Sequence, residues 1–331
     1  MRVAINGLGR IGRQLLRQLH GVAGLELVAV NDVAEPAALA HLVKWDSLHG
    51  RAGFPVAWAD GRLQLGDLRV PLSRIADPGQ LPFGALGAEV VVDCTGSFTR
   101  RAEAARHLGS GVARVILSSP SADADLTVIL GVNPERLADP GAQIVSAADP
   151  AAHALALLVT VLDAAFGVEG GLATAVESYR NDQRILDLPH ADGRLGRAAA
   201  LNMIPAPCAA ATCLAQVLPA MAGRFDALAV RVPTPDVSLL DLSVTLGRDA
   251  TAEAIRAAFL QAGAALPGLV EVLEEPLVSV DLRGATASCI LDPFLTRILT
   301  PRFVKVFAWY DNEVAAAARL KDLCLALGGA R

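Results

Sequence analysis

Three glycines, Gly7, Gly9 and Gly12, follow the apolar run at 3–6 and stand where a helical pattern begins. Glycines in such a turn let the backbone approach a pyrophosphate, and the helix N-terminus presents free N–H groups to the anion. Asp32 stands about twenty residues further on, at the end of the next strand, where its carboxylate can accept hydrogen bonds from an adenosine ribose. Its charge also repels a 2′-phosphate. The spacing predicts NAD binding in preference to NADP; the alternative is an ordinary glycine turn with an ordinary strand-end aspartate.

The stretch IVSAADPAAHALAL at 144–157 reads as a strand that runs into a helix. Asp149 is of a type favoured at the N-cap, and Pro150 is favoured at the first helical position. Structure alone can therefore account for both residues. His153, one turn into the helix, could act as an acid or base, or it could fill a polar position at the helix start.

The elements that must position these residues divide the chain into two parts. In the first third, apolar runs alternate with helical patterns, as a parallel sheet with crossover helices requires. From Asp149 onward, strands with period-two alternation and separate helices indicate an α+β domain with a mixed sheet. We expect strands at 3–6, 25–31, 90–92, 115–117, 128–130, 144–145, 171–179, 226–233 and 238–246, and helices at 10–19, 99–108, 150–166, 208–222 and 313–327.

Composition narrows the classes of function. The 331-residue chain is 53% hydrophobic and 19% charged, which fits two folded domains. Its net charge of −5, with the signs interspersed, offers no basic stripe for a nucleic acid. We expect a cytoplasmic protein with no membrane partner, because no apolar run could span a bilayer and no signal-peptide pattern is visible. Five scattered cysteines without CxxC spacing indicate neither a disulfide framework nor a metal site.

Motifs along essentially the whole chain, in order, resemble those of the glyceraldehyde-3-phosphate dehydrogenases: INGLGRIGR, VNDVAE, WDSLHGR, DCTGSFT, SSPSADA, ESYRNDQRILDLPHADGRLGRAAALNMIP, LAVRVPTPDVSLLDLSV and WYDNE. The resemblance implies an α/β protein with an NAD-binding Rossmann domain at 1–149, onto which a C-terminal helix at 313–331 docks, and a catalytic-type α+β domain at 150–312. It also implies that 179–200 is an S-shaped loop that contacts neighbouring subunits, and hence a homotetramer. The cofactor-binding positions that it implies are Gly7, Gly9, Arg10, Ile11, Gly12, Asp32, Thr95, Gly96, Ser119 and Asn312.

The resemblance breaks at the positions that carry the chemistry. In the family, an active cysteine stands at the start of the middle helix and a partner histidine precedes the S-shaped loop; Pro150 and Glu177 stand at those positions. A thiolate is required to attack the aldehyde and form a thioester, and proline has no such group. A carboxylate at Glu177 would also raise the pKa of a nearby thiol. We therefore expect no phosphorylating dehydrogenase activity.

Positions that bind phosphate in the family are retained unevenly. Arg231, Asp182 and either Arg194 or Arg197 match such positions, and Arg180 replaces a threonine of one phosphate site. The threonine and glycine of the inorganic-phosphate site match Cys208 and Ala209, and further hydroxyl positions are alanines. The resemblance therefore still implies a small phosphorylated or anionic ligand.

Four residues are candidates for chemistry of another kind, namely Glu177, His153, Asp149 and Cys208. Glu177 could be a general base, or it could pair with an arginine such as Arg180 or Arg231. Cys208 precedes an expected helix, where thiolates are stabilised, and could be a relocated nucleophile or a buried small side chain.

Two functions follow from the sequence, which leaves the enzyme question open. The first is an NAD-binding homologue that has lost thioester chemistry and acts as a binding or regulatory protein. The second is a repurposed oxidoreductase that uses noncovalent hydride transfer on a phosphorylated or carboxylated small molecule, with Glu177, His153 or Asp149 as acid or base. We favour the first, because alanines occupy several positions where the family has functional side chains.

Overall fold

The computed structural model describes residues 1–329, which form two compact units. Unit 1 contains 1–130, 134–148 and, of the described residues, 316–329. Unit 2 contains 131–133 and 149–315. The chain passes from one unit to the other directly before Asp149, the residue at which the sequence pattern changes.

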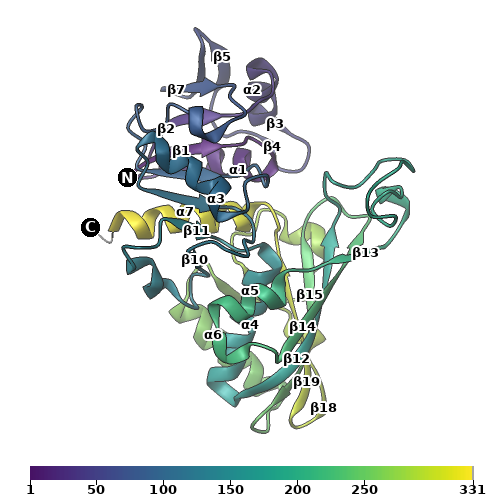
Figure 1. The fold of residues 1–331 in the computed structure, drawn as a ribbon. Helices are drawn as coiled ribbons and strands as arrows, with labels where there is room; N and C mark the ends of the chain where they lie inside the picture. Colours follow the sequence, from purple (N-terminus) through teal and green to yellow (C-terminus); the bar gives the residue numbers. More distant parts are fainter. Residues whose placement is uncertain (330–331) are drawn as a thin grey trace. The chain divides into compact units, whose positions relative to one another are not determined.

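Unit 1 is built on a nine-stranded sheet (Figure 1). Its strands lie in the order β10 (Leu126–Thr127), β11 (Ile144–Ser146), β9 (Arg114–Leu117), β8 (Val90–Asp93), β1 (Arg2–Asn6), β2 (Glu26–Asn31), β7 (Leu68–Ser73), β6 (Arg62–Leu65) and β5 (Val56–Ala59). The pairs from β10 to β7 are parallel, and β6 and β5 extend the sheet in antiparallel fashion. A hairpin of β3 (Trp45–Asp46) and β4 (Gly50–Arg51) stands apart from this sheet. The strand order reverses beside β1, and such switch points are where doubly wound sheets bind ligands.

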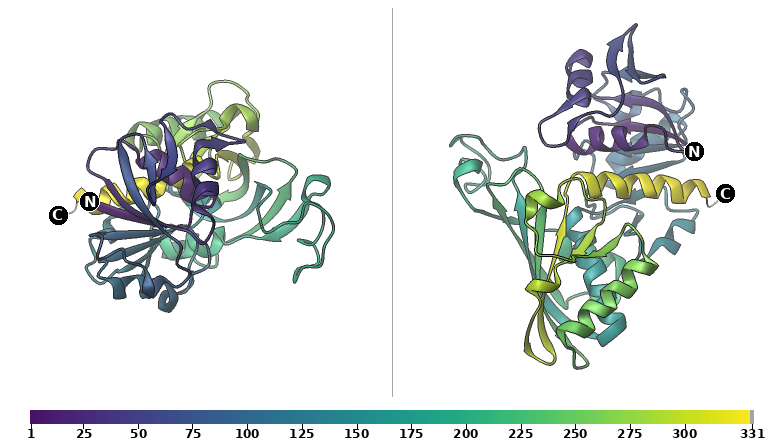
Figure 2. Two further views of the ribbon diagram at one scale, coloured as in Figure 1. Left: turned by 90° about the horizontal axis from the view of Figure 1, so that it is seen from above. Right: turned by 180° about the vertical axis from the view of Figure 1, so that it is seen from behind.

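The helices of unit 1 contribute apolar side chains to its hydrophobic clusters. They are α1 (Arg10–Leu19), α2 (Pro36–Lys44), the short α3 (Arg101–Ala104) and α7 (Val314–Gly329), most of which belongs to this unit. Helix α7, in yellow in Figure 2, is one continuous helix whose Leu320, Leu323 and Cys324 join the core that contains Val3 and Ile5. Residues of α7 and of β1, which are far apart in the sequence, therefore share one hydrophobic core.

Unit 2 is built on a mixed sheet of eight strands. The path is β13 (Ile204–Pro207), β14 (Phe225–Val232), β12 (Val168–Ser178), β15 (Ser238–Leu246), β19 (Phe303–Tyr310), β17 (Cys289–Leu291) and β16 (Val270–Val272), and β18 (Arg297–Thr300) pairs with β19. The pairing of β12 with β14 is parallel and places Glu177 beside Arg231. The central helix α4 (Pro150–Phe166) packs on one face of the sheet, flanked by α5 (Ala210–Val217) and α6 (Ala252–Ala265).

The two faces of this sheet differ in exposure. Along β15, buried residues alternate strictly with half-buried ones, because only one face is covered by α4. The loop at 179–203, between β12 and β13, projects from the end of the sheet (Figures 1 and 2). It carries exposed apolar side chains, among them Ile185 and Leu201, which are 87% and 80% exposed.

The predicted fold class is confirmed: an α/β unit with a parallel core, a unit with a mixed sheet, and a C-terminal helix. Three expected elements differ most in extent. The helix expected at 99–108 is an α-helix only over Arg101–Ala104 and continues as a 3₁₀ helix over Ala105–Ser110. The strand expected at 128–130 lies earlier, at Leu126–Thr127, because these two residues pair with β11. The helix expected at 208–222 ends at Val217 and continues only as a 3₁₀ turn from Pro219, since proline has no N–H to donate within a helix. Within residues 1–329, the helices are all too short or too polar to cross a membrane.

Packing of α7 predicts the effect of truncating its side chains. Leu323 is 1% exposed in the core of unit 1, whereas Leu325, in the same helix, is 37% exposed. Replacing Leu323 by alanine leaves a cavity and should lower the free energy of unfolding by about 2–5 kcal/mol. Leu325→Ala is the matched control and should cost under about 1 kcal/mol. Urea unfolding measures both; equal losses would contradict this role for α7.

Candidate functional site

The glycine turn of unit 1 is shaped by close backbone contacts. Gly7 has φ +92°, and a Cβ there would lie 2.9 Å from the Thr95 nitrogen. A Cβ at Gly12 would lie 1.9 Å from the Gly7 carbonyl oxygen. At Gly9, by contrast, a Cβ would meet no atom within 4 Å. Two glycines are therefore required by the turn itself, whereas Gly9 leaves open space at the start of α1.

Asp32 lies beside this turn at the end of β2. Its carboxylate accepts hydrogen bonds from the Leu8 N–H at 2.7 Å and from the Ala34 N–H at 2.9 Å. These two bonds fix the carboxylate and leave further lone pairs for a ligand hydroxyl. Gly9 caps α1 without a side chain, so the first N–H groups of the helix face the open space. This arrangement fits a dinucleotide, with the pyrophosphate at the helix N-terminus and the ribose at Asp32.

A buried polar network supports the turn from below. The Asn6 amide donates to Asp93 at 2.8 Å, and the Asn31 amide donates to Asn6 at 2.8 Å. Asp93 also accepts from the Thr95 hydroxyl at 2.6 Å, and its other oxygen lies 3.0 Å from His107 Nε2. Charge-assisted hydrogen bonds of this kind hold the ends of β1, β2 and β8 in one arrangement.

The remaining predicted cofactor positions also lie in unit 1, except Asn312. Arg10 and Ile11 begin α1, and Gly96 follows Thr95 at φ +67°. The Ser119 carbonyl accepts from the Ser146 hydroxyl at 2.9 Å. Asn312, in unit 2, accepts hydrogen bonds on its amide oxygen from Ser178 at 2.9 Å and Ser238 at 3.1 Å, which orients its N–H₂ group.

The start of α4 has the capping that the sequence indicates. Asp149 is extended, with φ −126° and ψ 166°, and its carboxylate accepts from the Ala152 N–H at 2.8 Å. Pro150 is the first helical residue. His153 lies one turn further and is buried. The N-terminus of the helix is therefore occupied by the chain's own carboxylate, and its first residue offers no nucleophile.

Glu177 and two arginines form an ion-pair cluster at the carboxyl end of β12. One Glu177 oxygen accepts from Arg180 Nη2 at 2.8 Å and lies 3.8 Å from Arg231 Nε. Arg231 also donates to both Asp182 oxygens, at 2.8 and 3.0 Å. The side chains of Glu177 and Arg231 are each only 6% exposed, whereas that of Arg180 is 43% exposed. The parallel register of β12 and β14 brings Glu177 and Arg231 together.

Burial and charge perturb the titration of this cluster. Burial raises the pKa of Glu177; Arg180 and Arg231 lower it, and Asp149 raises it further. Burial likewise raises the pKa of Asp149, against the Ala152 N–H and Arg180. Burial opposes the charge on Arg180, yet Glu177 and Asp149 hold its pKa above the ordinary value. The cluster thus pairs two carboxylates with raised pKa values and a strongly held arginine cation.

Cys208 lies in the same surroundings, just before α5. Burial raises the pKa of its thiol to about 11, the Ala210 N–H opposes this, and the charges of Asp149 and Glu177 raise it further. The sequence predicted that the nearby helix start would favour a thiolate at Cys208. In the structure, burial and the two carboxylates outweigh that effect and favour the protonated thiol. Reactive thiolates need the opposite environment, one that is electropositive and partly exposed.

Tyr310 is a member of the cluster that the sequence did not single out. It is 1% exposed, and its hydroxyl has no hydrogen-bond partner among residues 1–329. Its pKa is raised well above the ordinary value by burial and by the charges of Glu177 and Asp149. The one signal in the sequence was its place directly before Asp311 and Asn312, at the end of a strand with period-two alternation.

The structure does not bring every predicted anion-binding residue into this cluster. Arg197 pairs with Asp187 at 2.9 Å, and both side chains are 59% exposed. Arg194, also exposed, lies in the same loop, where its backbone N–H donates to Asp192 at 2.7 Å. The cluster that the structure does form contains Arg180, Arg231 and Asp182.

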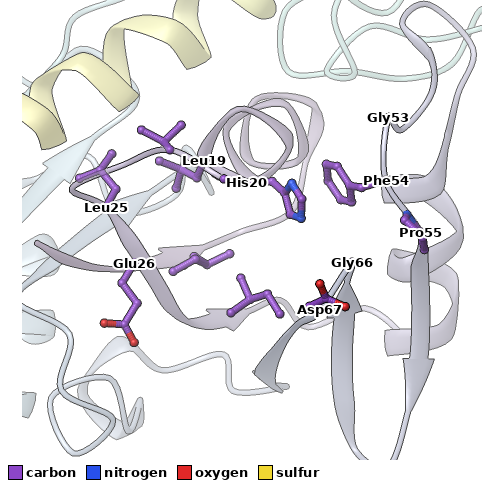
Figure 3. A pocket seen from close by; sticks show the side chains of 13 residues that line it. Leu19, His20, Leu25, Glu26, Gly53, Phe54, Pro55, Gly66 and Asp67 are labelled. Atoms are coloured by element: carbon purple, nitrogen blue, oxygen red, sulfur yellow. The ribbon is translucent and has the colours of Figure 1, made fainter.

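A separate hollow of about 490 Å³ lies in unit 1 at the C-terminal end of α1, opposite the glycine turn (Figure 3). The ring of His20 stacks on that of Phe54 at its wall, with ring centroids 3.8 Å apart. The His20 Nε2 lies 3.2 Å from the Leu65 carbonyl oxygen. None of the predicted site residues lines this hollow, and we assign it no role in the chemistry.

Two sequence models of one family match this chain. That of the glyceraldehyde 3-phosphate dehydrogenase NAD-binding domain matches residues 1–101, and that of the C-terminal domain matches 151–312. Glyceraldehyde-3-phosphate dehydrogenase 1 of Bacillus cereus is 43% identical over 323 residues, which cover 97% of each chain. The glyceraldehyde-3-phosphate dehydrogenase of Geobacillus stearothermophilus is 41% identical over 98% of this chain and 97% of its own. That of Streptomyces coelicolor is 40% identical over 99% of this chain and 98% of its own.

The three glycines predict two separable effects on unit 1. Gly12→Ala places a Cβ 1.9 Å from the Gly7 oxygen and should lower the free energy of unfolding by more than about 2 kcal/mol. Gly9→Ala meets no protein atom and should cost less than about 1 kcal/mol, yet its methyl group enters the space proposed for the pyrophosphate. Calorimetry with NAD should show at least about tenfold weaker binding for Gly9→Ala. Unchanged binding would show that the pyrophosphate lies elsewhere.

Proposed function

Because this chain belongs to the glyceraldehyde-3-phosphate dehydrogenase family, we propose that it is an NAD-binding homologue without phosphorylating dehydrogenase activity, which acts as a binding or regulatory protein. The cofactor is NAD, as the family and the glycine turn with Asp32 indicate. When bound, NAD would supply the capacity to accept a hydride. Whether a bound substrate can donate that hydride depends on the nucleophiles, acids and bases that this chain provides.

The observation that carries the proposal is that Asp149 and Pro150 form the start of α4. Pro150 occupies the position at which the resemblance to the family predicts a cysteine. The Asp149 carboxylate accepts a hydrogen bond from the Ala152 N–H. A thioester needs a thiolate that is stabilised by neighbouring positive charge. Asp149 and Glu177 are carboxyl groups and supply no positive charge. Where they ionise, their negative charge would disfavour a thiolate.

Cys208 does not supply the missing nucleophile in this proposal. With a pKa of about 11, its thiol is protonated in all but a very small fraction of molecules near neutral pH. Protonated thiols are poor nucleophiles. Burial is the main reason that the pKa of Cys208 is raised, and the charges of Asp149 and Glu177 add to it.

A second candidate is a repurposed oxidoreductase that uses noncovalent hydride transfer on a phosphorylated or carboxylated small molecule. The observation that favours it is the group of proton-holding side chains in unit 2, where Glu177 and Asp149 have raised pKa values. A carboxylate of raised pKa can act as a general base near neutral pH. NAD-dependent oxidation of a small hydroxy or aldehyde compound that is abolished by Glu177→Gln and kept by Cys208→Ser would favour this candidate.

We also propose that the protein is a cytoplasmic homo-oligomer, with a tetramer as the expected state. The support is apolar surface on unit 2 that water would otherwise contact. Leu172 and Leu228 on the sheet are 67% and 52% exposed, and Met203 at the end of the loop is 74% exposed. Large exposed apolar side chains on one unit support the proposal, because apolar surface of this kind is often covered by another subunit.

The central prediction of the proposal is that the protein produces no measurable NADH from glyceraldehyde 3-phosphate, NAD and phosphate. Loss of a nucleophile or its partner base in a covalent enzyme lowers turnover by roughly a million-fold. Pro150→Cys alone should stay inactive, because Glu177 and Asp149 oppose a thiolate there. Adding Glu177→His should give at most a trace, because Ala151 and Ala152 provide no hydroxyl groups for phosphate.

Cys208→Ser serves as the control for this assay. The Bacillus cereus relative, measured in parallel, sets the scale. Turnover within about a hundredfold of that relative would refute the proposal, since the loss predicted above is far larger. If the Cys208→Ser variant then lost this turnover, Cys208 would be identified as the nucleophile in place of the family's cysteine.

The assembly prediction is tested by changing one exposed side chain at a time. The unmodified protein should scatter light as an oligomer at micromolar concentration. Leu201→Glu, at a residue 80% exposed, buries a charge in the interface and should shift the mass toward smaller species. Leu42→Glu is the matched control, since Leu42 is 44% exposed on α2 of unit 1. A monomer in the unmodified protein would contradict the prediction.

A further inference from the structure

We propose that His107 is a positioning residue for the nicotinamide half of NAD, and that it acts through Asp93 on the exposed turn at 95–97. The inference rests on the proposed function in one respect, which is that NAD is the ligand. It adds a role in cofactor binding for a histidine that is 0% exposed and therefore touches no ligand itself.

The turn at 95–97 directly follows β8 and lies against the glycine turn, since a Cβ at Gly7 would lie 2.9 Å from the Thr95 nitrogen. The Ser97 N–H donates to the Thr95 hydroxyl oxygen at 3.1 Å. The Thr95 hydroxyl and N–H in turn donate to one Asp93 oxygen, at 2.6 and 3.0 Å. All three residues of the turn are exposed. The turn is therefore held by a buried group on one side and open to a ligand on the other.

Asp93 fixes this turn with one of its two oxygens, and the other oxygen fixes Asp93. That second oxygen accepts from the Asn6 amide at 2.8 Å and lies 3.0 Å from His107 Nε2. A carboxylate only accepts hydrogen bonds, so the proton of the second contact lies on Nε2. The Asp93 side chain is 2% exposed, so water cannot replace a lost donor. Removal of the His107 donor would therefore leave a buried acceptor short of a partner and loosen the carboxylate that holds the turn.

Packing holds the His107 ring in place on two sides. His107 lies in the 3₁₀ helix at Ala105–Ser110. Its ring is within 8° of parallel to that of Phe83, with centroids 6.3 Å apart. The ring of Phe98 meets it edge-on, with centroids 6.4 Å apart. Because Phe98 directly follows the turn and Asp93 precedes it, His107 contacts the chain at both ends of the turn.

The strand order indicates which half of NAD this turn faces. In the sheet, β1 lies between β2, which leads to Asp32, and β8, which leads to the turn at 95–97. Doubly wound sheets bind a dinucleotide across such a reversal of strand order, with one mononucleotide on each side. Asp32 suits the adenosine ribose, so the turn on the other side of β1 faces the nicotinamide half.

Calorimetry with NAD and with AMP tests the assignment, because AMP is the adenosine half of NAD alone. His107→Leu removes the N–H donor and should weaken NAD binding about tenfold, while AMP binding changes by less than about twofold. Asp32→Ala is the converse variant and should weaken the binding of both ligands. A variant that merely loosened the whole unit would weaken AMP and NAD alike, so the difference between the two ligands measures positioning.

Three further variants assign the effect to the hydrogen bonds. His107→Gln keeps an N–H donor on a side chain of similar length and should bind NAD within about threefold of the parent. Thr95→Val changes only an exposed residue, so it tests the turn without altering the core, and should weaken NAD binding about two- to tenfold with AMP binding unchanged. His20→Leu is the matched control and should change neither affinity, because the His20 Nε2 lies 3.2 Å from the Leu65 carbonyl oxygen at the other end of α1. Thermal unfolding checks that each variant is folded.

The outcomes separate this inference from the proposed function. Unchanged NAD affinity in folded His107→Leu or in Thr95→Val, or equal weakening of NAD and AMP binding, would overturn the inference alone. A His107→Gln variant that binds NAD as weakly as His107→Leu would also overturn it, since the N–H donor would then not be the group that acts. An unmodified protein that binds no NAD would overturn both. NADH production in the dehydrogenase assay would overturn only the proposed function, because the two affinities do not depend on it.

Discussion

A buried carboxylate at the end of a β-strand must be neutralised, and most of what is distinctive in unit 2 depends on how Glu177 meets this requirement. An isolated charge there would cost far more free energy than the fold could supply. Arg180, just beyond the end of the same strand, and Arg231, on the neighbouring parallel strand, both pair with the Glu177 carboxylate. Since loss of both arginines would leave the buried Glu177 charge uncompensated, the cluster constrains the sequence of this unit.

The same neutralisation decides which chemistry the unit can carry. Burial, together with the charges of Asp149 and Glu177, raises the pKa of the Cys208 thiol and of the Tyr310 phenol, so both of these groups keep their protons. The arrangement favours holding protons and binding anions over generating a nucleophile. Unit 1, by contrast, has the glycine turn and the Asp32 carboxylate that suit a dinucleotide, and the Asn6–Asp93 network supports that turn.

How much could be predicted from the sequence follows from the range of each interaction. The glycine turn, the cap at Asp149 and α4 depend on residues close in sequence, and their positions agree with the local patterns. The distance between Glu177 and Arg231 depends on the register of β12 with β14, which no local pattern specifies. Tyr310 escaped notice because only tertiary packing leaves its hydroxyl buried without a partner. The apolar residues at 128–130 looked like a strand, but burial alone explains them, since Val128 and Ile129 are 0% exposed outside any strand.

The central claim is that no covalent intermediate forms in this protein, and intact-protein mass spectrometry tests it most directly. The protein is mixed with NAD and glyceraldehyde 3-phosphate without phosphate, so that any thioester accumulates, and it is then quenched in acid. The Bacillus cereus relative, treated identically, provides the comparison. This account predicts an unchanged mass for the protein. An acyl adduct, mapped by peptide analysis to Cys208 or to any other side chain, would contradict it.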